Sequence, residues 1–162
     1  MAIQIITDST SDLTEEELQK LNVHMIHMRV IFEDAVYTDG VDISKEQFYE
    51  KRAAAKTLPK TTQVNPQEYC DIFESILQNG DEAVAILMSS KLSGTFQSAQ
   101  IAKGMAEGGE RLHLVDSLNV TIGEGRLVRE AVRLRDAGKS ASAIAAAIEE
   151  MKHRVRFVAF IG

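Results

Sequence analysis

Hydrophobic and polar positions along the chain follow two alternating periodicities. Short apolar runs predict β-strands, and they fall at Ile3–Thr7, Val23–Phe32, Ala83–Met88, Leu112–Val115 and Phe157–Ile161. Apolar residues at helical spacing predict helices over Glu15–Leu21, Lys45–Ala55, Pro66–Leu77, Thr95–Ala106, Ile122–Asp136 and Ala141–Lys152. Strands that alternate with helices are typical of an α/β fold with a mainly parallel sheet and helices on both faces. We expect residues 1–162 to form a single α/β domain of this kind.

Three of these helices begin with residues that satisfy their own backbone N–H groups. Thr14, Ser44 and Asn65 each stand three residues before a Glu or Gln, which is the spacing of a capping box. The helix that follows Ser93 differs, because its first turn, residues 94–97, contains no acid. The N–H groups and the positive dipole end of this helix are therefore suited to an external anion.

Polar clusters follow three of the predicted strands, at Thr7–Asp12, Ser89–Thr95 and Asp116–Asn119. The carboxyl ends of parallel strands meet at one edge of a sheet, which is where open α/β sheets bind ligands. A fourth polar segment, Lys60–Asn65, reads as a loop that ends in a helix cap. Each cluster alone is also an ordinary set of turn residues, but three at one edge favour a carboxylate or phosphate site.

Composition and charge narrow the classes of partner. The net charge is -6, and residues 1–50 hold eleven acids against three bases, with no basic patch interleaved with aromatic residues. Nucleic acid is therefore not expected as a partner. Cys70 is the single cysteine, which excludes an internal disulfide and a cysteine-based zinc site. No apolar run is long enough to span a membrane and no signal peptide is evident, so we expect a cytoplasmic protein. We also expect no metal and no cofactor.

Covalent catalysis fits the sequence poorly, and no catalytic residue is predicted. Ser93 has Lys91 and Thr95 where a nucleophile elbow has glycines, and no histidine is an obvious base for it. The zinc-protease and P-loop motifs do not occur. One enzymatic alternative stays open, a phosphate-handling hydrolase or transferase with Asp8 as nucleophile and the helix after Ser93 as phosphate site.

Five segments occur in a characteristic order along the chain: IITDSTSDL near the start, YTDGVDI at Tyr37–Ile43, PKTTQ at Pro59–Gln63, SSKLSGTFQSA from Ser89, and VDSLN with GEG within Val115–Gly125. Together they resemble the DegV family of bacterial fatty-acid-binding proteins. The resemblance implies an α/β first domain and a fatty acid as the ligand. It also implies, for some members, a role in presenting the fatty acid to a fatty acid kinase, in which the carboxylate oxygen would accept the phosphoryl group.

The resemblance also implies a set of ligand-binding residues. In the family the fatty acid lies in an apolar tunnel with its carboxylate at the Ser-Gly-Thr loop. Matched motif to motif, the carboxylate would be held by Thr61, Ser93 and the Gly94 N–H, with Thr62, Ser9 and Thr95 as further candidates. The family's loop usually reads Thr-Ser, whereas this chain has Thr61-Thr62, which keeps the hydroxyl and adds a methyl group.

The last seven residues, RFVAFIG, form an apolar run. In the family this point leads into a second domain that closes the lipid tunnel. We therefore expect residues 1–162 to represent the first domain alone. Uncovered tunnel-lining surface would favour self-association. A second alternative follows from the same expectation, namely that the isolated domain binds no ligand.

Overall fold

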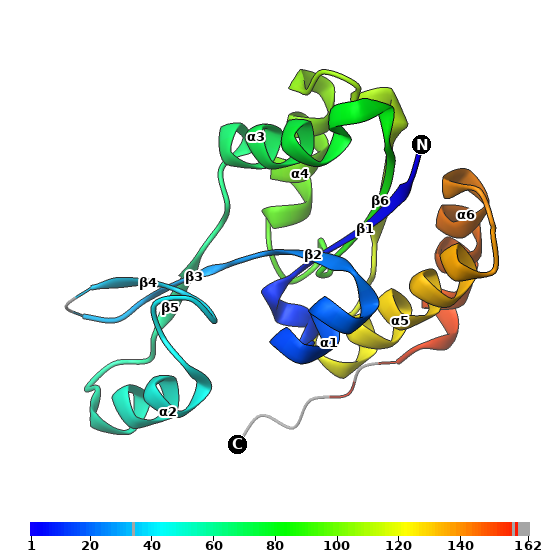
Figure 1. Ribbon diagram of the computed structural model, residues 1–162. Helices are drawn as coiled ribbons and strands as arrows, with labels where there is room; N and C mark the ends of the chain where they lie inside the picture. The colour runs from blue at the N-terminus through cyan, green and yellow to red at the C-terminus, as the bar shows by residue number, and fades with distance from the viewer. Residues whose placement is uncertain (34, 157, 159–162) are drawn as a thin grey trace.

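The computed structural model of the protein describes residues 1–33, 35–156 and 158 (Figure 1). The main sheet has the order β2-β1-β6-β7 and is built from β1 (Ile3–Asp8), β2 (Val23–Ile26), β6 (Glu82–Leu87) and β7 (Leu112–Asp116). All three of its strand pairings are parallel. The predicted fold class, a mainly parallel sheet flanked by helices, is therefore confirmed.

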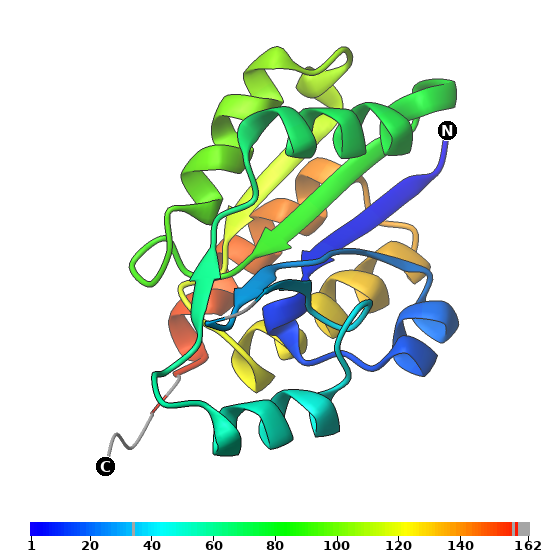
Figure 2. The ribbon, with the colours of Figure 1, turned by 90° about the vertical axis from the view of Figure 1, so that its left-hand side faces the viewer.

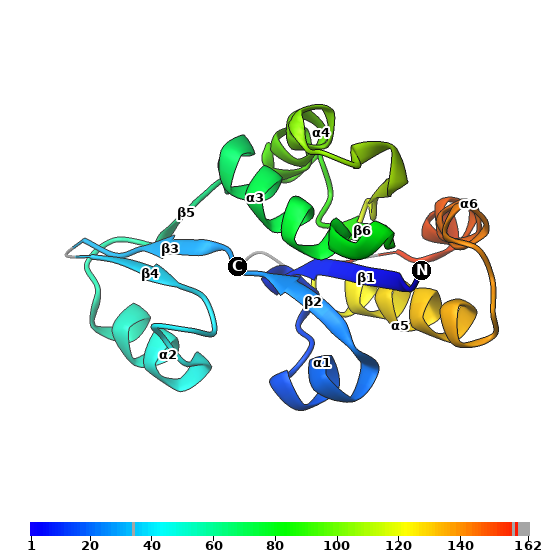
Figure 3. The ribbon, with the colours of Figure 1, turned by 45° about the horizontal axis from the view of Figure 1, so that its top comes forward.

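Helices cover both faces of the main sheet (Figure 3). One face carries α3 (Pro66–Leu77) and α4 (Thr95–Met105), and the other carries α1 (Glu15–Leu21), α5 (Ile122–Asp136) and α6 (Ala141–Met151). Four 3-10 turns complete this body: η1 (Ser9–Ser11), η2 (Gln78–Gly80), η3 (Gly109–Arg111) and η4 (Lys152–Arg154). The two layers of helices leave the carboxyl ends of the strands as the edge at which the loops gather.

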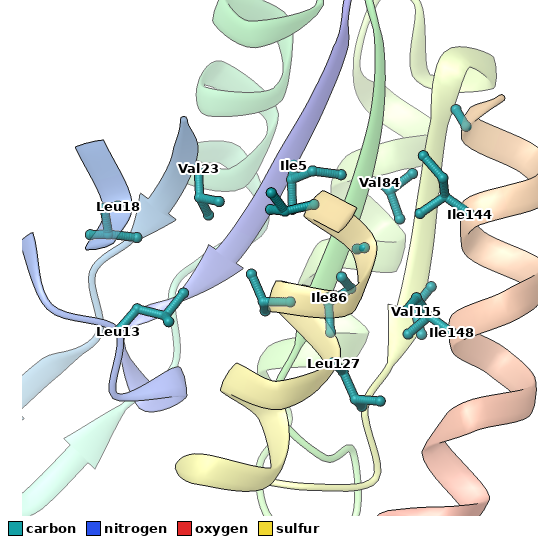
Figure 4. Packing of buried hydrophobic residues seen from close by; sticks show 14 residues of the cluster. Ile5, Leu13, Leu18, Val23, Val84, Ile86, Val115, Leu127, Ile144 and Ile148 are labelled. Carbon is teal, nitrogen blue, oxygen red and sulfur yellow. The ribbon is translucent and has the colours of Figure 1, made fainter. Parts of the chain in front are cut away.

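The apolar core lies in two layers because side chains alternate across each strand. Ile5 and Ile86 point to the side of α5 and α6, where they meet Leu127 and Ile148 (Figure 4). Ile6, Ala85 and Leu87 point to α3 and α4, where they meet Tyr69 and Phe73 among others. The last five residues of β6, residues 83–87, are fully buried, which explains why this strand reads as one continuous apolar run.

A smaller unit projects beyond the carboxyl ends of β1 and β6 (Figure 2). It contains an antiparallel sheet of order β4-β3-β5, formed by β3 (Arg29–Ile31), β4 (Val36–Thr38) and β5 (Lys60–Thr62), together with α2 (Lys45–Ala54). Its own core consists of Val30, Phe32 and Ile43, against which Tyr37 and Phe48 pack. This unit therefore stands next to the edge at which the sequence predicts a ligand.

Two predictions about this region are wrong. The strand predicted over Val23–Phe32 breaks at His27–Met28, because the Met28 N–H donates to Ser9 Oγ (3.1 Å) and the Met28 carbonyl accepts from Asp39 N (2.9 Å). Contacts outside the ladder thus redirect the chain from one sheet to the other. The predicted loop at Lys60–Asn65 begins with β5, a three-residue polar strand whose pattern carries no alternation of burial.

The helix starts agree with the sequence analysis. Thr14 and Ser44 form reciprocal capping boxes with Glu17 and Gln47, and Asn65 accepts from the backbone N–H of Glu68. The strand predicted at Phe157–Ile161 lies outside the described residues except for Val158, which belongs to no helix or strand. Within the part of the chain that the structure describes, no helix has the length and apolarity that a membrane span requires.

Candidate functional site

The three polar clusters at the strand ends are joined by hydrogen bonds, as expected from the parallel sheet. Asp8 Oδ2 accepts from Met88 N (2.9 Å), and the Asp116 carboxylate accepts from Ser90 N (3.1 Å) and Ser90 Oγ (2.5 Å). Ser89 N also donates to the Asn119 carbonyl (2.9 Å). The loop after β6 is therefore held in place by acids from the strands on either side of it.

The start of α4 lacks both kinds of internal partner, an acid in the first turn and an N-cap side chain, that α1, α2 and α3 have. Its first turn contains no acid, and the N-cap residue Gly94 supplies no side-chain hydrogen bond. Ser93 Oγ accepts from Thr95 N (3.2 Å) and donates to Thr95 Oγ1 (3.0 Å), so Ser93 satisfies part of this turn. Ser93 and Gly94 are half-buried, whereas Thr95 is fully buried. Thr95 therefore orients the Ser93 side chain through these two hydrogen bonds, and Thr95 itself does not face solvent.

The segment that contains Thr61 meets the turn that contains Ser93. The Gln63 amide lies against the Cα of Gly94, and a Cβ atom at residue 94 would overlap it. The absence of a Cβ atom at residue 94 therefore lets the Gln63 side chain approach the backbone of this turn closely. This contact brings together two of the sequence motifs that are separated by about 30 residues of chain.

A hollow of about 470 Å³, which we call the Ser9–Thr61 hollow, separates the main body from the small unit. It is lined by Ser9, Asp12, Val30, Asp39, Lys45, Phe48, Tyr49, Pro59 and Thr61. Thr61 pairs with Val30 across the β3–β5 ladder, so both side chains stand on the face that the hollow occupies. Ser9 Oγ accepts from Met28 N, which leaves the Ser9 hydroxyl hydrogen able to donate to a ligand.

The two neighbouring threonines stand on opposite faces of the small sheet, because successive side chains of a strand alternate. Thr62 pairs with Arg29, whose guanidinium forms an ion pair with Glu68 of α3 (2.9 Å). Of the six predicted residues, the structure thus places Ser9 and Thr61 in one hollow, Gly94 beside Gln63, and Ser93 against Thr95. Thr62 points to the α3 side.

The environment of Asp8 opposes its predicted alternative role as a nucleophile. Asp8 has no exposed surface. Its Oδ1 accepts from Thr10 N (2.9 Å) and Thr10 Oγ1 (2.5 Å), and its Oδ2 accepts from Met88 N. Burial raises the pKa of this carboxyl, although the bonds from Thr10 and Met88 oppose that effect. With both oxygens engaged in hydrogen bonds and no exposed surface, Asp8 is poorly placed to attack a phosphate ester.

Residues that the sequence analysis did not assign also shape the site. The Gln63 side chain contacts Gly94. Lys45 lines the hollow, and its Nζ lies 3.2 Å from Asp12. Glu124 is fully buried and contacts Thr10, the residue after Ser9. Gln63 and Glu124 belong to the PKTTQ and GEG segments, so the family motifs already included these two residues. Among residues 1–33, 35–156 and 158, no group of three His, Cys, Asp or Glu side chains is arranged to bind a metal.

Comparisons with known proteins agree with this architecture. The family model described as "Uncharacterised protein, DegV family" matches residues 2–161. A DegV domain-containing protein of Caldanaerobacter subterraneus subsp. tengcongensis is 38% identical over 154 residues, which cover 95% of this chain and 54% of the relative. This chain thus spans about half the length of the curated relatives it matches.

Two solved structures show the same fold. DegV from Bacillus subtilis, described as a fatty acid binding protein, matches with a TM-score of 0.85 and 29% identity, over 94% of this chain and 54% of that one. A DegV family protein from Thermus thermophilus, whose structure is described in terms of fatty acid binding, matches with a TM-score of 0.83 and 32% identity over the same shares. By its sequence and by its fold, this chain belongs to the DegV family.

Proposed function

We propose that this chain binds a long-chain fatty acid, with the carboxylate held by the Thr61 hydroxyl, by the Gly94 N–H, and by the Ser93 hydroxyl once its hydrogen turns from Thr95 Oγ1 to the ligand. The observation that carries the proposal is the Ser9–Thr61 hollow, which combines hydroxyl donors with an apolar wall of Val30, Phe48, Tyr49 and Pro59. Ser93 and Gly94 do not line the hollow, but the acid-free start of α4 and the contact of Gln63 with Gly94 support a head group held between Thr61 and this turn. Family membership and the fatty acid binding described for the two solved relatives support the choice of ligand.

The charges around the hollow indicate how the head group is held. Asp12 and Asp39 line the hollow together with a single lysine, Lys45, which is already paired with Asp12. Net charge therefore does not attract an anion here, and directed donors have to hold the carboxylate. A carboxylate that accepts several such hydrogen bonds stays ionised.

The acyl chain supplies most of the affinity in this proposal. Each methylene removed from water contributes about 0.8 kcal/mol. The apolar wall of the hollow offers aromatic and aliphatic side chains from β3, α2 and the segment before β5. The hydroxyl donors then select for the carboxylate end and fix its direction.

Lipid that remains bound through purification provides the first test. We expect mass spectrometry of an organic extract of the purified chain to detect fatty acid in stoichiometric amount. In a titration with the fluorescent fatty acid cis-parinaric acid, Thr61→Ala and Ser93→Ala should each weaken binding about tenfold or more, since a hydrogen bond to a charged group is lost. Thr62→Ala, whose side chain stands on the other face of the strand, is the matched control and should bind like the wild type.

Two outcomes would contradict the assignment. If Thr61→Ala and Ser93→Ala both bind like the wild type, these residues do not hold the head group. If Thr62→Ala weakens binding and Thr61→Ala does not, the ligand lies on the α3 side of the small sheet. Turnover of a phosphate ester that Asp8→Asn abolishes would favour the enzymatic alternative, which the burial of Asp8 opposes.

The finer role, in which the protein presents its fatty acid to a kinase subunit, stays a prediction of the family resemblance. In that role the chain supplies the substrate, while the partner supplies the catalytic residues. The test is transfer of the labelled γ-phosphate of ATP to the bound fatty acid when a fatty acid kinase subunit from the same organism is added. Transfer that requires Ser93 and Thr61 would support the role, and its absence with a kinase that is active on other carriers would contradict it.

A further inference from the structure

Glu124, the acid of the GEG segment, lies in the first turn of α5 and has no exposed surface. Its Oε1 accepts from Thr7 Oγ1 (3.2 Å), and its Oε2 lies 2.9 Å from Thr10 Oγ1. The same Thr10 Oγ1 lies 2.5 Å from Asp8 Oδ1. One hydroxyl therefore stands between two buried carboxyl groups.

The number of hydrogens in this cluster is constrained by chemistry. A threonine hydroxyl has one hydrogen, and it can donate to only one of the two carboxyl groups. If both acids were ionised, the other oxygen–oxygen contact would have no hydrogen in it, and two buried negative charges would face each other. One of the acids must therefore carry a proton and donate it to Thr10 Oγ1.

The partners of each acid identify which one carries the proton. Asp8 accepts from the backbone N–H groups of Thr10 and Met88, and such bonds stabilise a carboxylate. Glu124 is bonded to hydroxyl groups only, through Thr7 and Thr10. Glu124 is therefore the neutral carboxylic acid, which donates to Thr10 Oγ1, and Thr10 in turn donates to Asp8.

The charged and titratable neighbours act in the same direction. Burial raises the pKa of Glu124 well above its ordinary value, and the negative charge of Asp8 adds to this effect. Asp12, from the turn after η1, further raises the pKa of Glu124, and Asp39, from the small unit, raises that of Asp8. The pKa of the Tyr69 phenol, from α3, is raised chiefly by burial and further by the charge of Asp8, so this phenol is neutral.

The cluster fixes the turn that carries Ser9. The Thr10 carbonyl accepts from Thr121 N (2.8 Å), at the start of α5. One residue later, Ser11 packs so closely that a Cβ atom at Gly125 would stand 2.6 Å from its carbonyl oxygen. With Thr10 and Ser11 fixed against α5, Ser9 is directed toward the Met28 N–H and into the Ser9–Thr61 hollow.

We propose that Glu124 is a positioning residue for the head-group site, acting as a neutral acid that orients Thr10 and thereby holds Ser9 in the hollow. This inference rests on the proposed function, because the hollow has a head-group role only if a fatty acid binds there. It gives a role to the GEG segment, which contains none of the proposed head-group donors.

The test compares Glu124→Gln with Glu124→Ala. A glutamine amide donates to Thr10 Oγ1 as the neutral acid does, so Glu124→Gln should bind cis-parinaric acid within about twofold of the wild type at pH 7, and Glu124→Ala about tenfold more weakly. At pH 7 and above the ligand carboxylate is ionised. As pH rises further and Glu124 ionises, the wild type should lose affinity, and Glu124→Gln should not. Glu130→Gln, at a half-buried acid of the same helix that pairs with Arg133, is the matched control and should follow the wild type.

A measurement without ligand separates the two proposals. A raised pKa in the folded state means that stability falls as pH rises from the unfolded pKa of a glutamate toward the folded value. The unfolding midpoint of the wild type should therefore fall over that range, and that of Glu124→Gln should fall less. If the probe binds but the wild type and Glu124→Gln share the same pH dependence of binding, the positioning role is overturned and the proposed function stands. If the probe binds at no pH, both fail, and the unfolding midpoints still report whether Glu124 holds the proton.

Discussion

The side-chain amide of Gln63 lies against the Cα of Gly94, in the space that a Cβ atom at residue 94 would take. Because Gln63 is exposed and its side chain is flexible, Gly94→Ala should displace the amide with little loss of stability. It should nevertheless weaken fatty acid binding, since the displaced Gln63 side chain takes up space beside the Ser93–Gly94 turn. Titration with cis-parinaric acid checks this. The double variant Gly94→Ala with Gln63→Ala should recover part of the loss, and purely additive effects would contradict a shared contact.

A methyl group at Gly125 meets a different neighbour, the backbone carbonyl of Ser11, at 2.6 Å. Backbone cannot move aside as a flexible side chain can, so Gly125→Ala should destabilise the fold by about 1–3 kcal/mol. Gly104→Ala in α4 is the matched control, because its Cβ would meet nothing within 4 Å. That change should stabilise the protein by roughly 0.5–1 kcal/mol. Denaturant unfolding measures both, and equal effects of the two variants would contradict the close packing of η1 on α5.

Thr121 adopts a backbone conformation with φ 56° and ψ -130°, which residues with a side chain rarely adopt. Glycine tolerates this region, so Thr121→Gly should raise the free energy of unfolding by about 1 kcal/mol after the entropic cost of glycine is included. Ser140→Gly provides the contrast, because Ser140 caps α6 with φ -67° and carries no such strain. That variant should lose a few tenths of a kcal/mol. Chemical unfolding that shows Thr121→Gly to be destabilised would contradict the strain.

Glu17 should make stability sensitive to acid. The hydrogen bond from Arg129 lowers its pKa, and the bond from Thr14 N lowers it further. A depressed folded pKa gives stability that is complete above the unfolded pKa and is lost as pH falls through the folded value. Below about pH 4.5, the wild type should therefore lose more of its thermal midpoint than Glu17→Gln, which keeps the capping acceptor but does not titrate. Identical acid sensitivity of the two proteins would exclude this contribution.

Self-association also stays a prediction. Large apolar side chains are exposed on several described elements, among them Tyr49 beside the hollow, Leu92 in the loop before α4, and Ile122 at the start of α5. We expect the sedimentation coefficient of the chain to rise with concentration. A single monomeric species at high concentration would contradict it.

The main body was predictable because its signals are local. The fully buried run in β6 and the caps at Thr14 and Ser44 each act within a few residues, and the structure contains the corresponding strand and helices. The convergence of the three polar clusters followed from parallel topology alone.

The small unit was not predictable in the same way. The break at Met28 depends on a hydrogen bond that its N–H donates to a residue 19 positions earlier, and β5 owes its conformation to pairing with β3. The role of Glu124 depends on Thr7 and Thr10, more than 110 residues away in the chain. Such contacts leave no periodic pattern, so the sequence indicated the GEG segment through resemblance alone.

The separate core of the small unit determines where ligand binding would change the local stability of the molecule. Ser9 and Asp12 belong to the main body, whereas Val30, Phe48 and Thr61 belong to the unit built around Phe32. A unit with so small a core opens more readily than the layered body beside it. A fatty acid that lies between the two would act as a reversible cross-link, and amide hydrogen exchange would slow chiefly in β3, β5 and α2. The ligand would then complete the fold of the very wall that recognises it.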